Sequence, residues 1–255
     1  MSGVSFDRAA DFYDATRSLP DPVHDALTLI LAAELSARRP CLEIGVGTGR
    51  IALGLHRRGV QLIGADIAPA MVERLVGNAG GRMPFPLVMA DATRLAMTGS
   101  CLGAVLASHV LHLIGGWRLA VDEAFRVLQP GGTLLVDFGG GPPAPWSDPA
   151  RELMRRHGVL HVRPGVSSPE EVARHLGERA RMRPLDPGPM TVRRTLALDL
   201  EEWENQIHAW TWPYSARQIG AACVEVRAWA ASERWPLERE VELERIIQWW
   251  AFDRA

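Results

Sequence analysis

The sequence contains no lysine: all 28 of its basic residues are arginine. A phosphate-binding loop of the P-loop type ends in Gly-Lys-Ser or Gly-Lys-Thr, so the missing lysine argues against that kind of nucleotide site. The 30 acidic residues leave a net charge of −2. This balance gives no reason to expect a nucleic acid or an anionic membrane as a partner.

Cysteine is scarce, and long apolar runs are missing. Cys41, Cys101 and Cys223 form neither a metal-binding spacing nor a disulfide framework, which is typical of a reducing cytoplasm. The sequence contains no run of about 18 or more apolar residues, so no membrane span is predicted. Charged residues such as Asp7 and Arg8 stand where a signal peptide would be apolar. We therefore expect a cytoplasmic protein, and the scattered histidines and acids predict no metal site.

A glycine-rich loop follows the first apolar run of the chain, as Leu42-Glu43-Ile44-Gly45-Val46-Gly47-Thr48-Gly49-Arg50. In the dinucleotide fingerprint the third glycine would be residue 50, which is arginine here, so an NAD-dependent oxidoreductase is disfavoured. Glycines let the backbone approach a ligand closely, and the start of the following helix suits a carboxylate as well as a phosphate.

Two acids flank this loop in the sequence. Glu43 precedes the glycines and can attract an ammonium or sulfonium group. Asp66 ends the next apolar run, about 20 residues after Gly45, where a carboxylate can accept hydrogen bonds from both ribose hydroxyls. A ligand with an amino acid end and an adenosine end fits this pattern better than a dinucleotide.

On these residues the chain resembles the class I S-adenosylmethionine-dependent methyltransferases, in particular the small-molecule, methyltransferase type 11-like group. Further segments resemble landmarks of that family in the same order: 6–17, 63–71, 89–93, 106–112 and 126–134. The resemblance covers roughly residues 40 to 140 and fades beyond about residue 145. It implies an α/β fold with a doubly wound, seven-stranded, mostly parallel, Rossmann-like sheet. We expect one methyltransferase domain over 1–255, with a helical lid inserted over 142–185, after the fifth strand.

The resemblance also implies S-adenosyl-L-methionine as the cofactor. Asp66 corresponds to the acid that binds the ribose, Asp91 to the acid that binds the adenine amino group, and Tyr13 to a residue that closes over the cofactor. Arg17 is placed to reach the methionine carboxylate, although a solvated arginine remains an alternative, as turn capping does for the acids. The predicted cofactor-binding residues are Tyr13, Arg17, Glu43, Gly45, Val46, Gly47, Asp66, Ile67, Met71, Asp91, Ala92 and Ser108.

Alternating apolar runs and amphipathic patterns predict the order of the elements. A leading helix is expected over 22–38, two helices around Pro164-Gly165 within 148–182, and later helices over 200–210 and 216–230. The expected strands are 40–45, 60–65, 85–90, 101–107, 132–138, 191–198 and a closing strand over 241–249, for which a helix is the alternative.

Methyl transfer mainly requires orientation, with a base where the acceptor must lose a proton. His109 and His112 follow the fourth strand and are the predicted catalytic bases, although they can also simply bond the first turn of the next segment. Trp212 and Tyr214 are predicted to contact substrate, with ordinary core packing as the alternative. We therefore expect a methyltransferase acting on an oxygen, nitrogen or carbon atom of a small organic molecule, as a monomer or homodimer. A non-catalytic, cofactor-binding regulatory module is the alternative.

Overall fold

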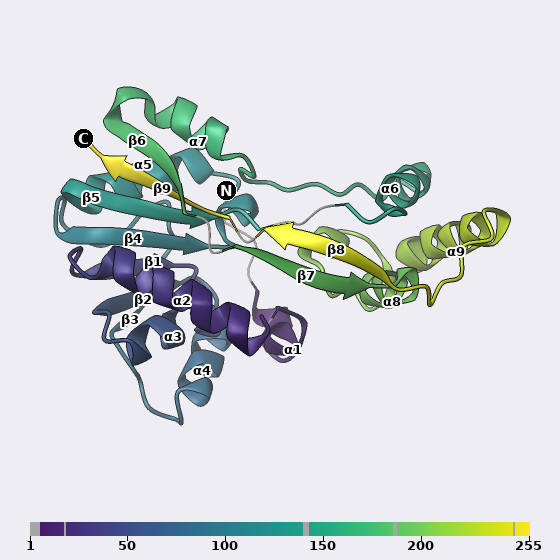
Figure 1. Cartoon of the computed structure of the whole chain (residues 1–255), viewed down its shortest axis with the longest axis horizontal. Coiled ribbons are helices and arrows are strands. Elements are labelled where there is room, and N and C mark those ends of the chain that lie inside the picture. The colour runs from purple at the N-terminus through teal and green to yellow at the C-terminus, as the bar shows by residue number, and fades with distance from the viewer. Residues whose placement is uncertain (1–5, 18, 140–142, 186–187, 247) are drawn as a thin grey trace. The chain divides into compact units, whose positions relative to one another are not determined.

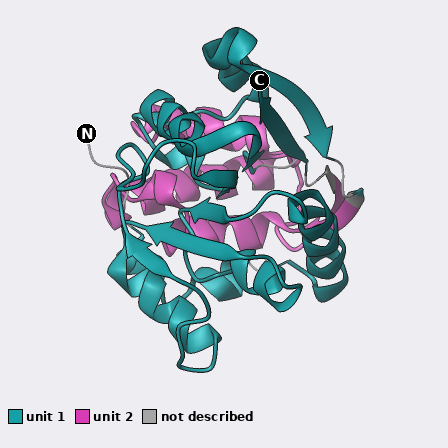
Figure 2. Ribbon diagram, turned by 90° about the vertical axis from the view of Figure 1, so that its left-hand side faces the viewer, with its two compact units in different colours: residues 1–139, 164–188, 247–255 teal, residues 140–163, 189–246 magenta. Residues whose placement is uncertain are grey.

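The computed structural model describes residues 6–17, 19–139, 143–185, 188–246 and 248–255. The chain forms two compact units (Figure 2). Unit 1 comprises residues 1–139, 164–188 and 247–255, and unit 2 comprises residues 140–163 and 189–246. The division differs from the lid expected over 142–185. Residues 164–185 belong to unit 1 because they contain a strand of its main sheet, whereas 189–246 join 143–163 in unit 2.

Unit 1 is built on a seven-stranded sheet in the order β3-β2-β1-β4-β5-β9-β6 (Figure 1). Strands β1 to β5 are parallel, and β9 is antiparallel to both β5 and β6. The predicted α/β fold with a mostly parallel sheet is confirmed. The strands are β1 (Cys41–Ile44), β2 (Leu62–Asp66), β3 (Leu87–Met89), β4 (Leu102–Ser108), β5 (Leu128–Asp137), β6 (Ala180–Leu185) and β9 (Trp249–Arg254).

The end of the chain departs from the predicted pattern. The single closing strand predicted over 241–249 is wrong: β8 (Val241–Ile246) pairs with β7 (Pro189–Arg194) in a separate sheet, and β9 closes the main sheet. Strand β7 also ends earlier than predicted, because Thr195 accepts a hydrogen bond from the Leu198 N–H and caps the next helix. The first residues of β6 fall within the range predicted to be helical.

Helices cover the main sheet and begin at recognisable signals. Pro22 and Pro69 stand in the first turns of α2 and α4, where the missing N–H costs nothing. The helical elements of unit 1 are η1 (Asp7–Ala9), α1 (Tyr13–Arg17), α2 (Asp21–Leu35), α3 (Ala52–Arg57), α4 (Pro69–Asn78), η2 (Leu111–Leu113), α5 (Trp117–Val127), α7 (Pro169–Leu176) and η3 (Gly177–Arg179). None of the helices in the described ranges is long and apolar enough to cross a membrane.

Unit 2 has its own hydrophobic core and its own two-stranded sheet. Its helices are α6 (Ser147–Arg156), α8 (Leu196–Glu204), η4 (Ala209–Thr211) and α9 (Ala216–Ser232). Trp146 is fully buried in this core, and its indole N–H donates to Asp199 Oδ2 at 2.7 Å. A capping box between Ser215 and Gln218 starts α9. Two segments that are distant in sequence therefore share one core.

Candidate active site

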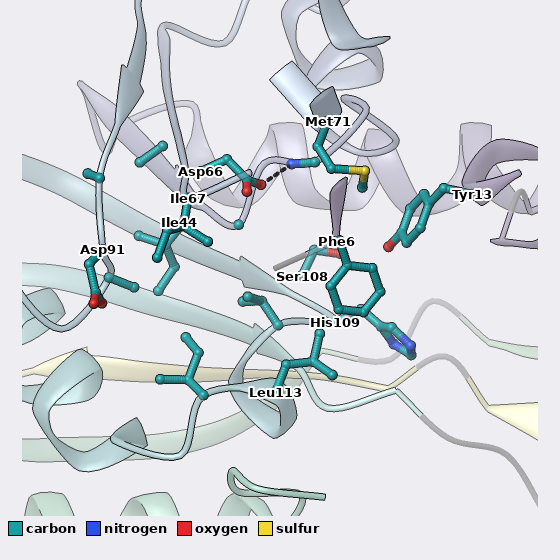
Figure 3. A pocket seen from close by; sticks show the side chains of 17 residues that line it. Phe6, Tyr13, Ile44, Asp66, Ile67, Met71, Asp91, Ser108, His109 and Leu113 are labelled. Carbon is teal, nitrogen blue, oxygen red and sulfur yellow. Dashed lines mark hydrogen bonds between the residues drawn. The ribbon is translucent and has the colours of Figure 1, made fainter. Parts of the chain in front are cut away.

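A pocket lies at the carboxyl edge of the parallel strands, where ligands bind in open α/β sheets. All of its lining residues belong to unit 1. Figure 3 shows Asp91 at one end of the pocket, and Tyr13, Phe6 and His109 at the other. The lining residues are Phe6, Tyr13, Ile44, Gly45, Gly47, Ala65, Asp66, Ile67, Met71, Ala90, Asp91, Ala92, Ser108, His109, Val110, Leu113 and Ile114.

Most of the predicted cofactor residues meet in this pocket. Tyr13, Gly45, Gly47, Asp66, Ile67, Met71, Asp91, Ala92 and Ser108 line it, together with the predicted base His109. Arg17, Glu43, Val46 and His112 do not line it. Sequence reasoning missed Phe6, Ile44, Ala65, Ala90, Val110, Leu113 and Ile114. Several of these residues are next to predicted residues in the sequence. Their position at the end of a predicted strand could have identified them.

The glycine loop approaches the pocket because Gly45, Gly47 and Gly49 all have positive φ. Gly45 has φ +64° and Gly47 has φ +55°, a conformation that favours glycine. A Cβ at Gly45 would lie only 2.4 Å from Cγ2 of Val110, so the loop and the segment after β4 can pack together only if residue 45 has no side chain. The buried Val46 donates its N–H to Ala65 O at 3.0 Å, which holds the loop against β2.

Asp66 connects this loop to the end of β2. Its Oδ2 accepts from the Gly47 N–H at 2.7 Å, and its Oδ1 accepts from the Ala68 N–H at 2.9 Å. Burial raises the pKa of Asp66, whereas the backbone N–H groups of Ala68, Gly47 and Ile67 act in the opposite direction. Each carboxylate oxygen can accept a further hydrogen bond, which suits a pair of ligand hydroxyls.

Asp91 provides a second acceptor among apolar neighbours. Its Oδ1 accepts from both the N–H and the hydroxyl of Thr93 at 2.8 Å. Both bonds use the same oxygen, so Oδ2 can face a donor group on a ligand. The pocket wall here includes Ala90, Ala92, Leu113 and Ile114. An apolar wall with one acceptor suits a planar ring that carries an amino group.

Glu43 lies directly behind the glycine loop and is only 2% exposed. Its Oε2 has no hydrogen-bond partner among the described residues. Burial raises the pKa of Glu43 to about 8; the nearby Arg50 lowers it, and Asp66 raises it further. The Arg50 guanidinium in turn donates to Ser108 Oγ at 3.2 Å and lies 3.9 Å from Asp137 Oδ2. Charged groups therefore surround the part of the pocket next to Ser108.

The N-terminal segment 6–17 packs on this site. Asp14 accepts hydrogen bonds from Thr48 Oγ1 at 2.5 Å, Asn78 Nδ2 at 2.9 Å and Arg74 Nε at 3.3 Å. These bonds tie α1 to both the glycine loop and α4. Tyr13 is thereby held at the pocket, and burial raises the pKa of its hydroxyl.

His109 and His112 lie close together but differ in access to the pocket. Their rings meet edge to face with centroids 4.7 Å apart. His109 lines the pocket, whereas His112 is buried and does not line it. His109 therefore has the better geometry for contact with an acceptor.

Trp212 and Tyr214 belong to unit 2, where their polar atoms bond to the backbone. The Trp212 indole donates to Gln206 O at 2.8 Å. The Tyr214 hydroxyl accepts from the Leu160 N–H at 2.9 Å and donates to Leu160 O at 3.1 Å. These bonds give both side chains a structural role within unit 2, and their contact with substrate stays a prediction.

Comparison with known proteins points to one enzyme class. The family described as "Methyltransferase domain" matches residues 42–136. The demethylmenaquinone methyltransferase of Streptomyces avermitilis is 27% identical over 204 residues, which are 78% of this chain and 87% of that protein. The demethylmenaquinone methyltransferase of Clavibacter sepedonicus is 32% identical over 148 residues, which are 55% of this chain and only 58% of that protein.

Two solved structures share the fold. The YcgJ protein of Bacillus subtilis has a TM-score of 0.59 and 21% identity, and the match covers 91% of this chain and 99% of that chain. A putative methyltransferase of Bacillus halodurans has a TM-score of 0.59 and 17% identity, covering 90% of this chain and 97% of that chain. At these identities the likeness shows the fold alone.

Proposed function

Since the chain belongs to the class I S-adenosylmethionine-dependent methyltransferases, we propose that this pocket binds S-adenosyl-L-methionine. The methyl group is transferred to an oxygen, nitrogen or carbon atom of a small organic molecule. The observation that carries the proposal is the convergence of Gly47, Asp66 and Asp91 on one pocket at the carboxyl edge of the sheet.

The chemistry of the lining residues assigns the parts of the cofactor to the parts of the pocket. The adenine lies against the apolar wall beside Asp91, and the ribose hydroxyls donate to Asp66. In this proposal the methionine end lies between the glycine loop and Tyr13. Glu43 and Arg17, which do not line the pocket in the ligand-free protein, are the residues proposed for its ammonium and carboxylate groups. Asp91 and Tyr13 lie at opposite ends of the pocket, which supports this order (Figure 3).

When bound, the cofactor supplies a methyl group that is already activated, so the protein mainly has to orient the acceptor atom. His109 lines the methionine end of the pocket beside Ser108. We assign His109 as the base that takes a proton from the acceptor, since histidine changes charge near neutral pH. The buried ring of His112 contacts that of His109 edge to face and supports it.

The names of the relatives support a small-molecule acceptor, because both are demethylmenaquinone methyltransferases. The three cysteines of the chain are free, which supports a cytoplasmic location. A screen of cell-extract metabolites with a labelled methyl donor identifies the acceptor. Binding without any transfer would instead favour a regulatory module.

Calorimetry with S-adenosylmethionine and S-adenosylhomocysteine tests the proposed site. Asp66→Ala removes two charge-assisted contacts to the ribose, so we expect a loss of about 1.5–3 kcal/mol, or roughly 10- to 150-fold in Kd. Asp11→Ala, at an exposed position of the N-terminal segment, is the control and is expected to bind like the wild type. Unchanged affinity in Asp66→Ala would move the ribose site elsewhere.

A further inference from the structure

The corner at the end of β5 lies directly against the imidazole of His109. Ser108 and Asp137 are register partners, so the residues that follow them leave the sheet side by side. The His109 N–H donates to Asp137 O at 3.0 Å, and the Gly139 N–H donates to Asp137 Oδ1 at 2.7 Å. Asp137 therefore accepts hydrogen bonds from both chain segments that form this corner.

Gly139 leaves open the space that the His109 ring occupies. A Cβ at position 139 would lie 2.1 Å from both Nδ1 and Cε1 of His109, which is far inside van der Waals contact. The imidazole can lie where it does only when residue 139 has no side chain. A side chain at residue 139 would therefore have to displace the His109 ring.

The backbone of His109 also depends on this corner. His109 has φ +54°, a conformation that residues with side chains rarely adopt. Such a conformation persists only where the surrounding structure holds it, and the bond to Asp137 O is one of the contacts that do so. Asp137 is itself 8% exposed and lies 3.9 Å from Arg50, so the corner is anchored within the polar part of the site.

We propose that residues 137–139 are the positioning element of His109, and that position 139 has to be glycine for the transfer step. The inference rests on the proposed function, in which His109 faces the acceptor. Asp137 and Gly139 are positioning residues: they act through His109 and touch neither cofactor nor acceptor.

Gly139→Ala and Gly131→Ala form a matched pair for testing this proposal. Both glycines have positive φ, +65° and +76°, so alanine strains the backbone at either position. A Cβ at Gly131 meets no atom within 4 Å, so only Gly139→Ala collides with His109. The side-chain resonances of His109 are followed in 15N-labelled, ligand-free protein and are identified by their loss in His109→Gln.

We expect Gly139→Ala to shift the His109 imidazole resonances and their pH titration, and Gly131→Ala to leave them unchanged. S-adenosylhomocysteine should bind Gly139→Ala within about threefold of the wild type, since Asp66 and Asp91 are untouched. His109 resonances that superimpose on those of the wild type, or that move equally in both variants, would overturn the proposal. Absence of S-adenosylhomocysteine binding by the wild type would sink the proposed function, while the resonances would still decide the positioning role.

Activity on the acceptor from the metabolite screen gives the second readout. General-base catalysis contributes roughly 100- to 10,000-fold, so Gly139→Ala should lower kcat by at least tenfold without changing the KM for the cofactor. The double variant Gly139→Ala/His109→Gln should be no slower than His109→Gln alone, because the glycine acts only through the histidine. Losses that multiply in the double variant would contradict this role.

Discussion

Glu43 places an ionisable group away from water, directly behind the glycine loop. Its carboxyl is buried, and its Oε2 has no hydrogen-bond partner in the described part of the chain. With a pKa near 8 the group carries its proton at neutral pH in the ligand-free protein. A cation placed beside it would favour the ionised form. The position of this acid before the glycines was visible in the sequence, but its burial depends on the folded neighbours.

The protonation of Glu43 makes stability depend on pH in a definite direction. The unfolded chain releases this proton near pH 4.5, whereas the folded protein holds it up to about pH 8. Between these values the folded state binds more protons, so this group lowers the free energy of unfolding as the pH rises. Glu43→Gln removes the effect. The free energy of unfolding of Glu43→Gln, relative to that of the wild type, should increase by a few kcal/mol between pH 5 and pH 8. The increase is on the order of 1.4 kcal/mol per pH unit. Urea unfolding of both proteins measures this difference, and a difference that is constant with pH would contradict the assignment.

The segment from His109 to Ile114 follows β4 and lines the pocket. Gly165 packs closely against the backbone of this segment. The Gly165 N–H donates to His112 O at 3.0 Å. A Cβ at Gly165 would lie 1.9 Å from Leu111 O and 2.8 Å from Ile114 O. The sequence predicts the Pro164-Gly165 pair only as a break between two helices. Its contact with the pocket wall follows from the tertiary fold.

Gly165→Ala should therefore disturb the pocket wall as well as the stability. Overpacking of this kind typically costs about 1–3 kcal/mol, and we expect weaker binding of S-adenosylhomocysteine because Leu113 and Ile114 must move. Gly77→Ala in α4 is the control, since its Cβ meets open space and alanine favours a helix by up to about 1 kcal/mol. Thermal unfolding and calorimetry on both variants check the prediction. A Gly165→Ala variant with wild-type stability and affinity would contradict this packing role.

Strands β1 to β5 are predicted by the sequence, because each is a short apolar run before a loop. Strands β6, β8 and β9 are predicted poorly for a physical reason. The partly apolar alternation of residues 241–254 is shared by two strands that enter different sheets, and the choice of pairing partner depends on contacts that are distant in sequence.

In the pocket, the acids and glycines were predictable from residue type and spacing. Leu113 and Ile114 were not, because apolar residues near a loop are common everywhere.

Across the whole of unit 1, Arg183 joins parts of the chain that are far apart in sequence. Its guanidinium bonds to Glu34 on α2 and to Asp253 on β9, with Nε 2.7 Å from Asp253 Oδ2. Hydrogen bonds to Asp253 and Glu34 raise the pKa of Arg183. The network therefore connects the first long helix with the last strand of the sheet.

Arg183→Ala should destabilise unit 1 by about 1–3 kcal/mol, because Glu34 and Asp253 lose one of the two arginines that they share. Arg38 remains, 2.7 Å from Glu34 Oε1 and 3.8 Å from Asp253 Oδ1. Arg58→Ala removes an ion pair with the exposed Asp25, and we expect it to cost no more than about 1 kcal/mol. Urea unfolding at low and high salt measures both variants. Equal losses would show that the network adds nothing beyond a surface pair.

The fold of the whole molecule was predictable where the family landmarks run, between residues 40 and 140. Unit 2 was not, because its core joins two segments that are separated in sequence by residues 164–188 of the other unit. Trp146 and Trp235, for example, meet with ring centroids 5.9 Å apart although they are distant in sequence. The aromatic run 210–214 suggests a substrate pocket when only the sequence is considered, and two of its residues, Trp210 and Tyr214, pack against this core.

The placement of Phe6 on the pocket wall has a practical consequence for anyone who prepares the protein. Only five residues would separate Phe6 from an affinity tag fused directly ahead of Met1. The other terminus follows β9, which is antiparallel to β5, and Arg254 bonds to Leu128 O at the start of that strand. A tag placed after Ala255 therefore emerges at the opposite edge of the sheet, and ligand titrations are best performed with purification handles there.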